Sequence, residues 1–396
     1  MELRSITLFC EPDFSHEDAA SFFAAAVDAF AVPVQTRRVA LPPFPNWWQP
    51  QQPAEAQAEA IARQWQEATA DYVSLGPVQL RHHADWLGLL PEVLGAGDVI
   101  FASAEVADQH GHIDTGRCTA VARVIRQAST LQENGFGNLY FTALANCPAG
   151  SPFFPVAYHG GGAPGFALAV QAADLAQQAM GSAGDLTEAR RNLVSAIERE
   201  AAALTQASEA LAHDHPLAFR GIDFSLAPFP DDDTSLARAM EALGLPWVGA
   251  AGSLFAAAFI AEAIDRATFR RCGFSGLMLP VLEDSVLALR AGAGHITVND
   301  LLSYAAVCGV GLDTIPLPGD VDVASLGAIL CDVAALATRL DKPLTARLMP
   351  LPGLKAGDPV HFDFPYFADS GVMAVTGGSG GLLQKAARLA LRPHSA

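Results

Sequence analysis

Residues 307–320 place a cysteine, two carboxylates and three glycines in one short stretch of the chain. Cys308, Asp313 and Asp320 lie along this segment, and two prolines fix the path by which the backbone leaves it. Glycine permits backbone angles that other residues avoid, and proline restricts φ, so such a segment can hold reactive side chains in place. We therefore interpret residues 307–320 as a rigid loop at a functional site.

Two other segments alternate apolar and polar residues, as a β-strand with two different faces does. Asp223 and Ser225 occupy alternate positions in one of them, and His361 and Asp363 in the other. On a barrel wall that helices cover from outside, these four side chains would point into the lumen. The alternative is a strand at a sheet edge whose polar face meets water. Two such strands in one chain favour the lumen.

Five acidic residues in or near turns are candidate metal ligands: Glu283, Asp284, Asp313, Asp320 and Asp363. Paired carboxylates can share a proton or bind a divalent cation, and their oxygens suit Ca²⁺, Mg²⁺ or Mn²⁺ better than zinc. The competing interpretation is that such acids only begin a helix or hydrogen-bond their own backbone. A transition metal is the further option at His361 and Asp363.

Other side chains could transfer protons or bind substrate. His159 precedes three glycines and is a candidate general acid or base, like His361, Asp223 and Glu283. Cys308 is a candidate nucleophile, but the end of an expected helix disfavours its thiolate, so we expect it to be dispensable. Arg347 could grip a substrate carboxylate through two hydrogen bonds. Ser225 and Asn138 are further candidates for binding substrate.

Strand and helix signals interleave along the chain, which predicts an α/β fold. Expected strands cover residues 3–9, 34–40, 97–102, 139–146, 219–227, 275–280, 344–349 and 360–364. Expected helices cover residues 16–30, 54–70, 115–132, 166–180, 186–212, 234–243, 253–268, 298–307, 322–340 and 382–391. We assign residues 1–376 to one barrel domain with a helical coat, and residues 377–396 to a Gly-rich connection and a surface helix.

Composition argues against several classes of partner. The formal net charge of −18 repels nucleic acid and anionic membranes. None of the three lysines stands in a Gly-Lys-Ser/Thr loop, so no nucleotide is expected. The six cysteines form no Cys-x-x-Cys pair and are interpreted as reduced thiols. A cytoplasmic protein that binds a small molecule is expected, and a homo-oligomer is compatible with the sequence.

The chain resembles a family of uncharacterised proteins known as domain of unknown function 711. The resemblance rests on Phe153-Phe154-Pro155 and Tyr158-His159 within residues 134–167, and on residues 221–228, 275–284, 308–320 and 347–358. It implies a ten-stranded β/α barrel similar to that of pyruvate formate-lyase, with a loop inserted in the centre. It does not imply the radical chemistry, because adjacent active cysteines and an Arg-Val-x-Gly-Tyr-type segment are absent from the sequence.

These residues together predict a barrel enzyme that performs non-radical acid/base chemistry, as a hydrolase or lyase. Its substrate would be small and hydroxylated or carboxylated, and a divalent metal would assist in one version of the mechanism. One alternative is a non-catalytic regulatory protein that binds a small metabolite in the same lumen. Another is a glycoside hydrolase that uses paired carboxylates.

Overall fold

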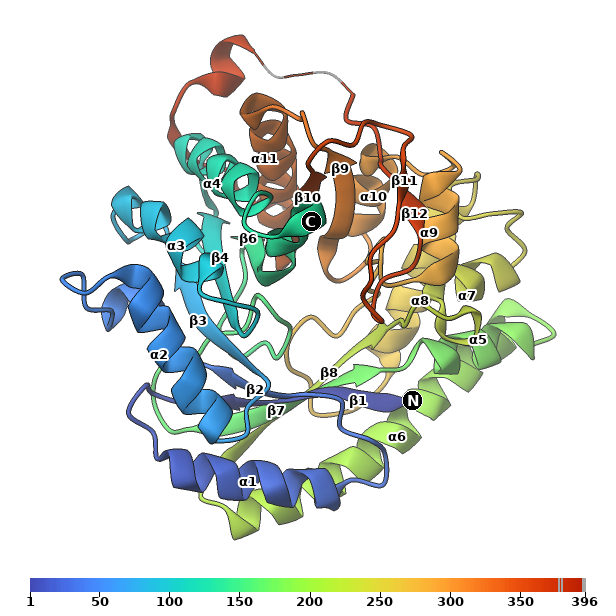
Figure 1. Cartoon of the computed structure of the whole chain (residues 1–396). Coiled ribbons are helices and arrows are strands. Elements are labelled where there is room, and N and C mark those ends of the chain that lie inside the picture. Colours follow the sequence, from blue (N-terminus) through green and yellow to red (C-terminus); the bar gives the residue numbers. More distant parts are fainter. Residues whose placement is uncertain (377, 379, 394–396) are drawn as a thin grey trace.

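The computed structural model describes residues 1–376, 378 and 380–393 of the chain. It has a mixed α/β fold built on one large sheet (Figure 1). The strands on the main path of this sheet are β1 (Glu2–Phe9), β2 (Arg37–Ala40), β3 (Tyr72–Val78), β4 (Ile100–Ala107), β6 (Phe141–Ala145), β7 (Gly165–Gln171), β8 (Ala218–Ala227), β9 (Gly311–Pro318) and β10 (Leu344–Leu351). Short strands β5 (His112–Asp114) and β13 (Arg388–Ala390) pair beside β4, and β11 (Pro359–Val360) pairs with β12 (Ser370–Gly371).

The strand order is β8-β7-β1-β2-β3-β4-β6-β10-β9. Strands β1, β2, β3, β4 and β6 run parallel to one another. β7 and β10 are antiparallel to their neighbours β1 and β6, and each continues into a parallel partner, β8 or β9. The sheet is therefore mostly parallel, with a change of direction on either side of its central five strands.

An irregular segment, residues 270–282, lies between the two ends of this path. It forms a parallel bridge to β8 at Arg271 and Ile222, and another to β9 at Pro280 and Asp313. The N–H of Val281 also donates to the carbonyl of Asp313 (3.0 Å). The sequence predicts a strand at residues 275–280, but the bridges are too isolated to form one.

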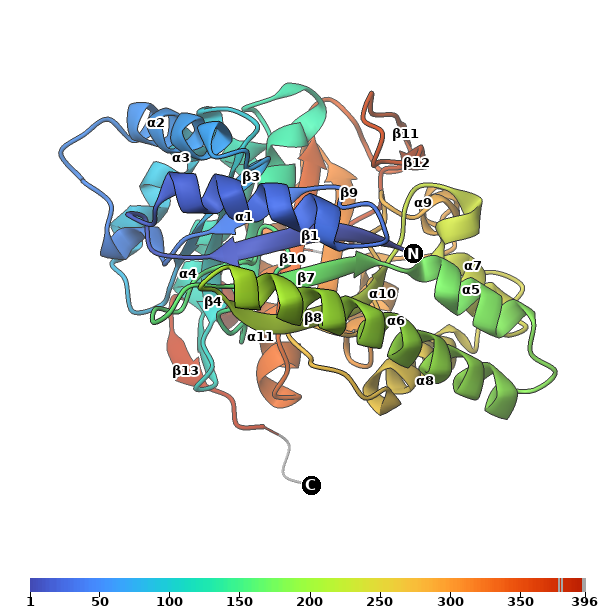
Figure 2. The same cartoon turned by 90° about the horizontal axis from the view of Figure 1, so that it is seen from below.

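Helices pack on the outer side of the sheet. They are α1 (His16–Ala29), α2 (Ala54–Glu67), α3 (Leu90–Gly95), α4 (Thr115–Ala128), α5 (Ala173–Gly181), α6 (Leu186–Asp214), α7 (Leu236–Ala242), α8 (Ser253–Arg266), α9 (Ser285–Gly292), α10 (Val298–Ala305) and α11 (Val323–Arg339). Figure 2 shows α1 and α6 lying against each other over β1, β7 and β8. Helix α10 begins with a capping box, in which the side chains of Thr297 and Asp300 each accept a hydrogen bond from the other residue's backbone N–H.

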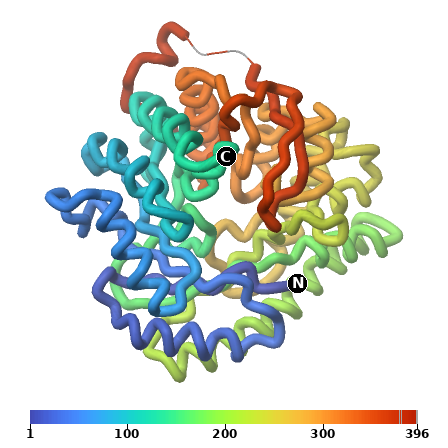
Figure 3. The backbone as a smooth tube through the Cα atoms, in the orientation of Figure 1, coloured from blue at the N-terminus to red at the C-terminus, as the bar shows by residue number. Residues whose placement is uncertain are grey.

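Short 3-10 helices complete the connections. They are η1 (Phe44–Asn46), η2 (Ala84–Leu89), η3 (Glu133–Tyr140), η4 (Asp232–Thr234) and η5 (Gly381–Gln384). Figure 3 follows the red segment after β10 as it runs beside the orange elements α9 and α10. There the Ser370 hydroxyl donates to the Ala288 carbonyl (2.9 Å), which ties β12 to α9.

One helix among the described residues, Val323–Leu340, is long and apolar enough to cross a membrane by length and composition alone. Its apolar side chains, among them Leu326, Leu330 and Val333, are buried. The helix packs against α4, β4, β6 and β10. This packing accounts for its apolar character as that of a core helix.

The segment between β6 and β7, residues 147–164, enters the hollow side of the sheet; we call it the inner loop. The Ser74 hydroxyl of β3 donates to the carbonyl of Ala157 (2.6 Å), and the N–H of His159 donates to the carbonyl of Leu41 after β2 (3.0 Å). Phe154 packs edge-on against Phe101 of β4. The inner loop is thus held by three neighbouring strands.

Several predicted elements need correction. Residues 311–318 form strand β9 rather than a loop, and residues 165–171 form β7 rather than the start of a helix. Of the predicted strand 360–364, only Val360 lies in a strand, at the end of β11. The expected C-terminal helix is replaced by η5 and β13, which pairs with β5. Gly377, Ser379 and residues 394–396 of that predicted connection lie outside the described residues.

Candidate functional site

A cavity of about 80 Å³ lies in the hollow of the sheet; we call it the arginine cavity. Its charged wall residues are Arg4, Arg38, Asp223, Glu283 and Arg347. Its aromatic wall residues are Tyr72, Phe101, Phe153, Phe154, Phe364 and Tyr366. A space of this size holds several water molecules or one small solute. The charged groups come from β1, β2, β8 and β10 and from the segment that precedes α9.

Arg347 of β10 is the centre of a buried ion-pair network. Its Nη2 donates to Glu283 Oε1 (2.8 Å) and its Nε donates to Asp313 Oδ1 (2.6 Å). The second oxygen of Glu283 accepts from Arg4 Nη2. The second oxygen of Asp313 is buried and has no hydrogen-bond partner within the described chain. The network thus fixes the two carboxylates and leaves one oxygen unpaired.

Burial and neighbouring charges shift the pKa values of this network in opposite directions. Burial opposes the ionisation of Glu283, but the charges of Arg4 and Arg347 outweigh it and hold the pKa of this carboxyl below its usual value. Burial raises the pKa of Asp313, although Arg347 opposes the shift. Burial also opposes the charge on Arg347, but Asp313 and Glu283 more than compensate and raise its pKa. Arg347 and Glu283 are therefore a permanent ion pair.

Arg38 of β2 differs from the other two arginines of the cavity. Its Nε donates to the hydroxyl of Thr36 (2.8 Å), and no carboxylate of the described residues lies within ion-pair distance of its guanidinium. The guanidinium carbon lies 5.1 Å from the centre of the Phe154 ring and 5.7 Å from that of Tyr72. Burial, with the nearby charge of Arg4, lowers its pKa to about 10, so it is still protonated at neutral pH. Arg38 is thus a half-buried cation that contacts the Thr36 hydroxyl and two aromatic rings but no carboxylate.

Asp223 and Ser225 lie on the cavity wall at the end of β8. The Ser225 hydroxyl donates to Asp223 Oδ1, which also accepts from the backbone N–H of Ser275 (2.9 Å). Asp223 Oδ2 accepts from the N–H of Phe274 (2.9 Å). Burial raises the pKa of Asp223 in spite of these donors. The carboxyl therefore anchors the irregular segment to β8 and presents a proton-binding group to the cavity.

The strands deviate from regular pairing where they carry these charges. The register of β9 and β10 shifts at Arg347, which faces both Asp313 and Thr314. Thr314 has a φ of 45°, a rare value for a β-branched residue. In β1 the shift falls at Arg4, the extra residue opposite β7. Bulges redirect side chains and are frequent beside active sites, so these irregularities support a functional role for the cavity.

Comparison with known proteins identifies the family. The sequence model described as "Uncharacterised ACR (DUF711)" matches residues 15–367. The chain belongs to this family. It is 39% identical over 249 residues to a UPF0210 protein of Pyrobaculum arsenaticum, an alignment that covers 60% of this chain and 55% of the relative. It is 29% identical over 360 residues to a UPF0210 protein of Caldicellulosiruptor saccharolyticus, which covers 85% of this chain and 78% of that relative.

The lengths of the relatives limit what these matches cover. The matched region spans 50% of a UPF0210 protein of Pyrobaculum aerophilum, at 40% identity over 229 residues. The chain thus spans about half the length of the two Pyrobaculum relatives. The residues of the arginine cavity lie within the family match, except Arg4, which precedes it. The family resemblance predicted from sequence is confirmed.

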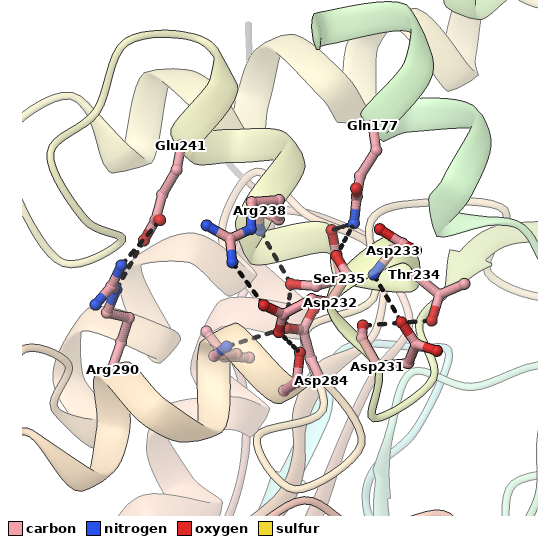
Figure 4. A network of polar contacts seen from close by, with 12 residues as sticks. Gln177, Asp231, Asp232, Asp233, Thr234, Ser235, Arg238, Glu241, Asp284 and Arg290 are labelled. Atoms are coloured by element: carbon pink, nitrogen blue, oxygen red, sulfur yellow. Dashed lines mark hydrogen bonds and ion pairs between the residues drawn. The ribbon is translucent and has the colours of Figure 1, made fainter.

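The five predicted metal ligands of this DUF711 protein are not brought together. Glu283 and Asp313 are both bound by Arg347. Asp284 accepts hydrogen bonds from the Ser235 hydroxyl and from N–H groups at the starts of α7 and α9 (Figure 4). Asp320 and Asp363 are exposed. The described residues contain no group of three or more His, Cys, Asp and Glu side chains placed to hold a metal ion.

His361 and Asp363 do not face the lumen, which corrects the interpretation of their alternating segment. Both side chains are exposed, and His361 Nδ1 lies 2.6 Å from an oxygen of Asp369. The phenylalanines between and after them point inward instead, and Phe362 and Phe367 are buried. The aromatic side chains cover the interior, so the polar positions of this segment meet solvent.

Three further candidates lie outside the arginine cavity. Cys308 is buried at the end of α10, and burial raises the pKa of its thiol. Asn138 of η3 donates to the Ile125 carbonyl (3.1 Å) and ties η3 to α4. His159 is buried on the other side of the inner loop, in a separate cleft. The structure thus brings Asp223, Ser225, Glu283 and Arg347 to one cavity, with Asp313 behind Arg347.

Sequence reasoning missed Arg4 and Arg38. Both lie inside segments that the sequence predicts as strands, 3–9 and 34–40. A charged residue inside a strand covered on its outer side is expected to face the lumen, and this rule selects both arginines, although it also selects Arg37, which pairs with Asp71 instead. The aromatic wall carries no comparable signal, because aromatic residues usually serve packing.

Proposed function

We propose that the arginine cavity is the active site of an enzyme that acts on a small carboxylated substrate by non-radical acid/base chemistry. The observation that carries the proposal is Arg38, a protonated guanidinium on the cavity wall without a carboxylate partner in the described structure. A guanidinium that is half-buried without a carboxylate partner has lost part of its hydration, and a substrate carboxylate would offset that loss through two hydrogen bonds. The aromatic rings around Arg38 would enclose the apolar part of the substrate.

Asp223 is our candidate for proton transfer. It lies on the same wall, its pKa is raised by burial, and the Ser225 hydroxyl beside it can bind a substrate oxygen. Glu283 and Asp313 have a different task in this proposal. They hold Arg347 and Arg4 in fixed positions, so that the substrate meets a preorganised set of positive groups. This arrangement fits a lyase or hydrolase that moves a proton beside a carboxylate.

We also propose that the fold closes into a ten-stranded barrel similar to that of pyruvate formate-lyase. The irregular segment 270–282 would serve as the tenth strand, because it bridges the two edge strands β8 and β9. The inner loop would be the loop inserted at the centre. The arginine cavity would then be part of the barrel lumen.

A metal has no assigned step in this mechanism. A cation bound by Glu283 and Asp313 would have to displace Arg347 from both. The divalent cation therefore stays a prediction, and elemental analysis of protein purified without added metal tests it. A cytoplasmic location and a small-molecule partner, rather than nucleic acid or membrane, are likewise proposals that the acidic composition supports.

A non-catalytic metabolite-binding protein is the second candidate. One observation favours it: each carboxylate at the cavity is already engaged, Glu283 by two arginines and Asp223 by three donors. A glycoside hydrolase needs two carboxylates that act on the sugar, so the same observation argues against that alternative.

Calorimetric titration with glycolate, lactate, pyruvate and malonate tests the binding site. We expect Arg38→Gln to weaken binding by roughly tenfold to a hundredfold, the loss typical of a charge-assisted hydrogen bond. Arg37→Gln is the matched control, since Arg37 lies next to Arg38 on β2 but pairs with Asp71. Absence of binding by all four acids, or equal loss in both variants, contradicts the proposed site.

Proton exchange separates the enzyme from the binder. In D₂O, we expect the wild-type protein to exchange a hydrogen beside the carboxylate of a bound acid, observed by proton NMR. Asp223→Asn is expected to bind the acid but not to exchange the hydrogen. Binding without exchange in the wild-type protein supports the metabolite-binding alternative instead.

A further inference from the structure

A second hollow opens at the carboxyl ends of four neighbouring parallel strands. This cleft, of about 780 Å³, is lined by Glu11 after β1, Pro42 after β2, Gln79 after β3 and Asp108 after β4. We call it the strand-end cleft. It shares no lining residue with the arginine cavity. In α/β proteins ligands commonly bind outside the carboxyl ends of parallel strands, and the strand-end cleft occupies this position.

The inner loop separates the two hollows. Phe153 and Phe154 face the arginine cavity, whereas Tyr158 and His159 line the strand-end cleft. The Tyr158 hydroxyl donates to the carbonyl of Cys147 (3.2 Å), and the backbone N–H of His159 is bound to Leu41. One loop therefore supplies rigid walls to both hollows.

Two buried polar atoms at the cleft lack hydrogen-bond partners within the described chain. His159 is 2% exposed, and its Nε2 has no partner; the nearest carboxylate oxygen, of Glu11, is 3.6 Å away. The side-chain oxygen of Gln79 is likewise buried without a partner. Buried polar groups are normally paired, so two orphans at one cleft indicate a missing partner that can both donate and accept.

A third polar group completes the inner wall. Glu105 near the end of β4 is 4% exposed. Its Oε2 accepts from the backbone N–H of Leu80 (2.9 Å), and its Oε1 is bound only weakly by Gln79 Nε2 (3.4 Å). Burial raises the pKa of Glu105 to about 7 and lowers that of His159, so at neutral pH Glu105 is about half protonated and His159 carries little positive charge.

We propose that the strand-end cleft is a second ligand site, specific for a small neutral polyhydroxylated molecule such as a sugar or polyol. A hydroxyl group donates and accepts, so adjacent hydroxyls can satisfy the oxygen of Gln79 and the Nε2 of His159 together. The half-buried indole of Trp47 offers an apolar face for the C–H side of such a ligand. On the rim Arg388 is paired with Asp108, which leaves this arginine less available to an anion.

Saturation-transfer NMR with glucose, mannose, ribose, glycerol and myo-inositol as probes tests this site. We expect saturation transfer to at least one probe, with affinity weakened about tenfold in Gln79→Leu by the loss of one hydrogen-bonding group. Gln127→Leu, on the exposed side of α4, is the matched control and is expected to bind as the wild type does. Arg38→Gln is also expected to leave this binding unchanged, since Arg38 lines the other cavity.

The ring nitrogens of His159 provide a second measurement. In protein with ¹⁵N-labelled histidine, we expect the Nε2 resonance of His159, assigned through His159→Gln, to shift when the bound probe is added. No transfer to any of the five probes overturns the proposal, as does transfer that Gln79→Leu leaves unchanged. Transfer lost in Arg38→Gln but kept in Gln79→Leu places the ligand in the arginine cavity and equally overturns the strand-end site.

Discussion

The Nε of Arg347 lies 2.6 Å from Oδ1 of Asp313, which faces it across the bulged pairing of β9 and β10. Both side chains are buried. A buried charge that loses its partner keeps the full cost of its removal from water. Removing one member of a buried ion pair at the arginine cavity is therefore expected to lower the stability of the fold.

Replacement of Arg347 by methionine is therefore expected to destabilise the fold strongly. The change leaves Asp313 without its cation and Glu283 with Arg4 alone. We expect a loss of about 3–5 kcal/mol in the free energy of unfolding, measured by urea denaturation. Arg266→Gln, which removes an exposed ion pair with Glu262, is the control and is expected to cost less than about 1 kcal/mol. Similar losses in both variants contradict the expectation.

Glu105 is expected to make stability depend on pH. Its pKa rises from 4.5 to about 7 on folding, so the folded protein binds this proton more tightly than the unfolded chain. Protonation of Glu105 favours the folded state. This contribution to the free energy of unfolding is complete below pH 4.5 and is lost as the pH rises to about 7. In Glu105→Gln this contribution is absent. Urea denaturation at both ends of this range is expected to show that the wild type loses about 3 kcal/mol more than the variant. Parallel profiles for both proteins argue against a raised pKa.

Asp284 is expected to matter for folding because it serves two helices. Its oxygens accept from Ser235, Leu236 and Ala237 at the start of α7, and from Leu287 in α9. Asp284→Ala is expected to cost about 2–4 kcal/mol, more than the loss of one cap. Asp320→Ala, at an exposed position, is expected to change stability by no more than about 0.5 kcal/mol. If Asp284 is a metal ligand instead, chelator treatment will lower the melting temperature of the wild type and leave Asp284→Ala unaffected.

Cys308 is expected to be dispensable for catalysis. Its thiol is buried and its pKa is raised, so little thiolate forms. We expect Cys308→Ser to keep its fold and measurable turnover of whichever acid the exchange experiment identifies. In the native wild type, Cys308 is expected to react with a thiol reagent more slowly than the partly exposed Cys331. Complete loss of turnover in a folded variant, or a covalent adduct on Cys308, refutes this view.

Much of the fold follows from local pattern. The apolar runs at β1, β2, β6, β8 and β10 and the amphipathic stretches at α1, α2, α4, α6, α8 and α11 are visible in the sequence, because side-chain periodicity reports which face an element buries. β9 was not visible. Pro316 and Pro318, taken alone, favour a loop. A strand at the end of the strand order has a neighbour on one side only, so fewer of the strand's backbone N–H groups must donate and proline is tolerated.

The site was determined by sequence only in part. Asp223 and His361 occupy the same kind of alternating segment, but Asp223 lies on the cavity wall and His361 is exposed. Alternation predicts that a segment has two different faces, but it does not predict which face is buried. Around His361, the phenylalanine face is the inner one, because Phe362, Phe364 and Phe367 pack against one another. Composition and residue type thus determined the α/β fold, the family and the supply of charged groups. Only tertiary structure brought Arg4, Arg38 and Arg347 to one cavity, because strands distant in the chain become neighbours only when the sheet assembles.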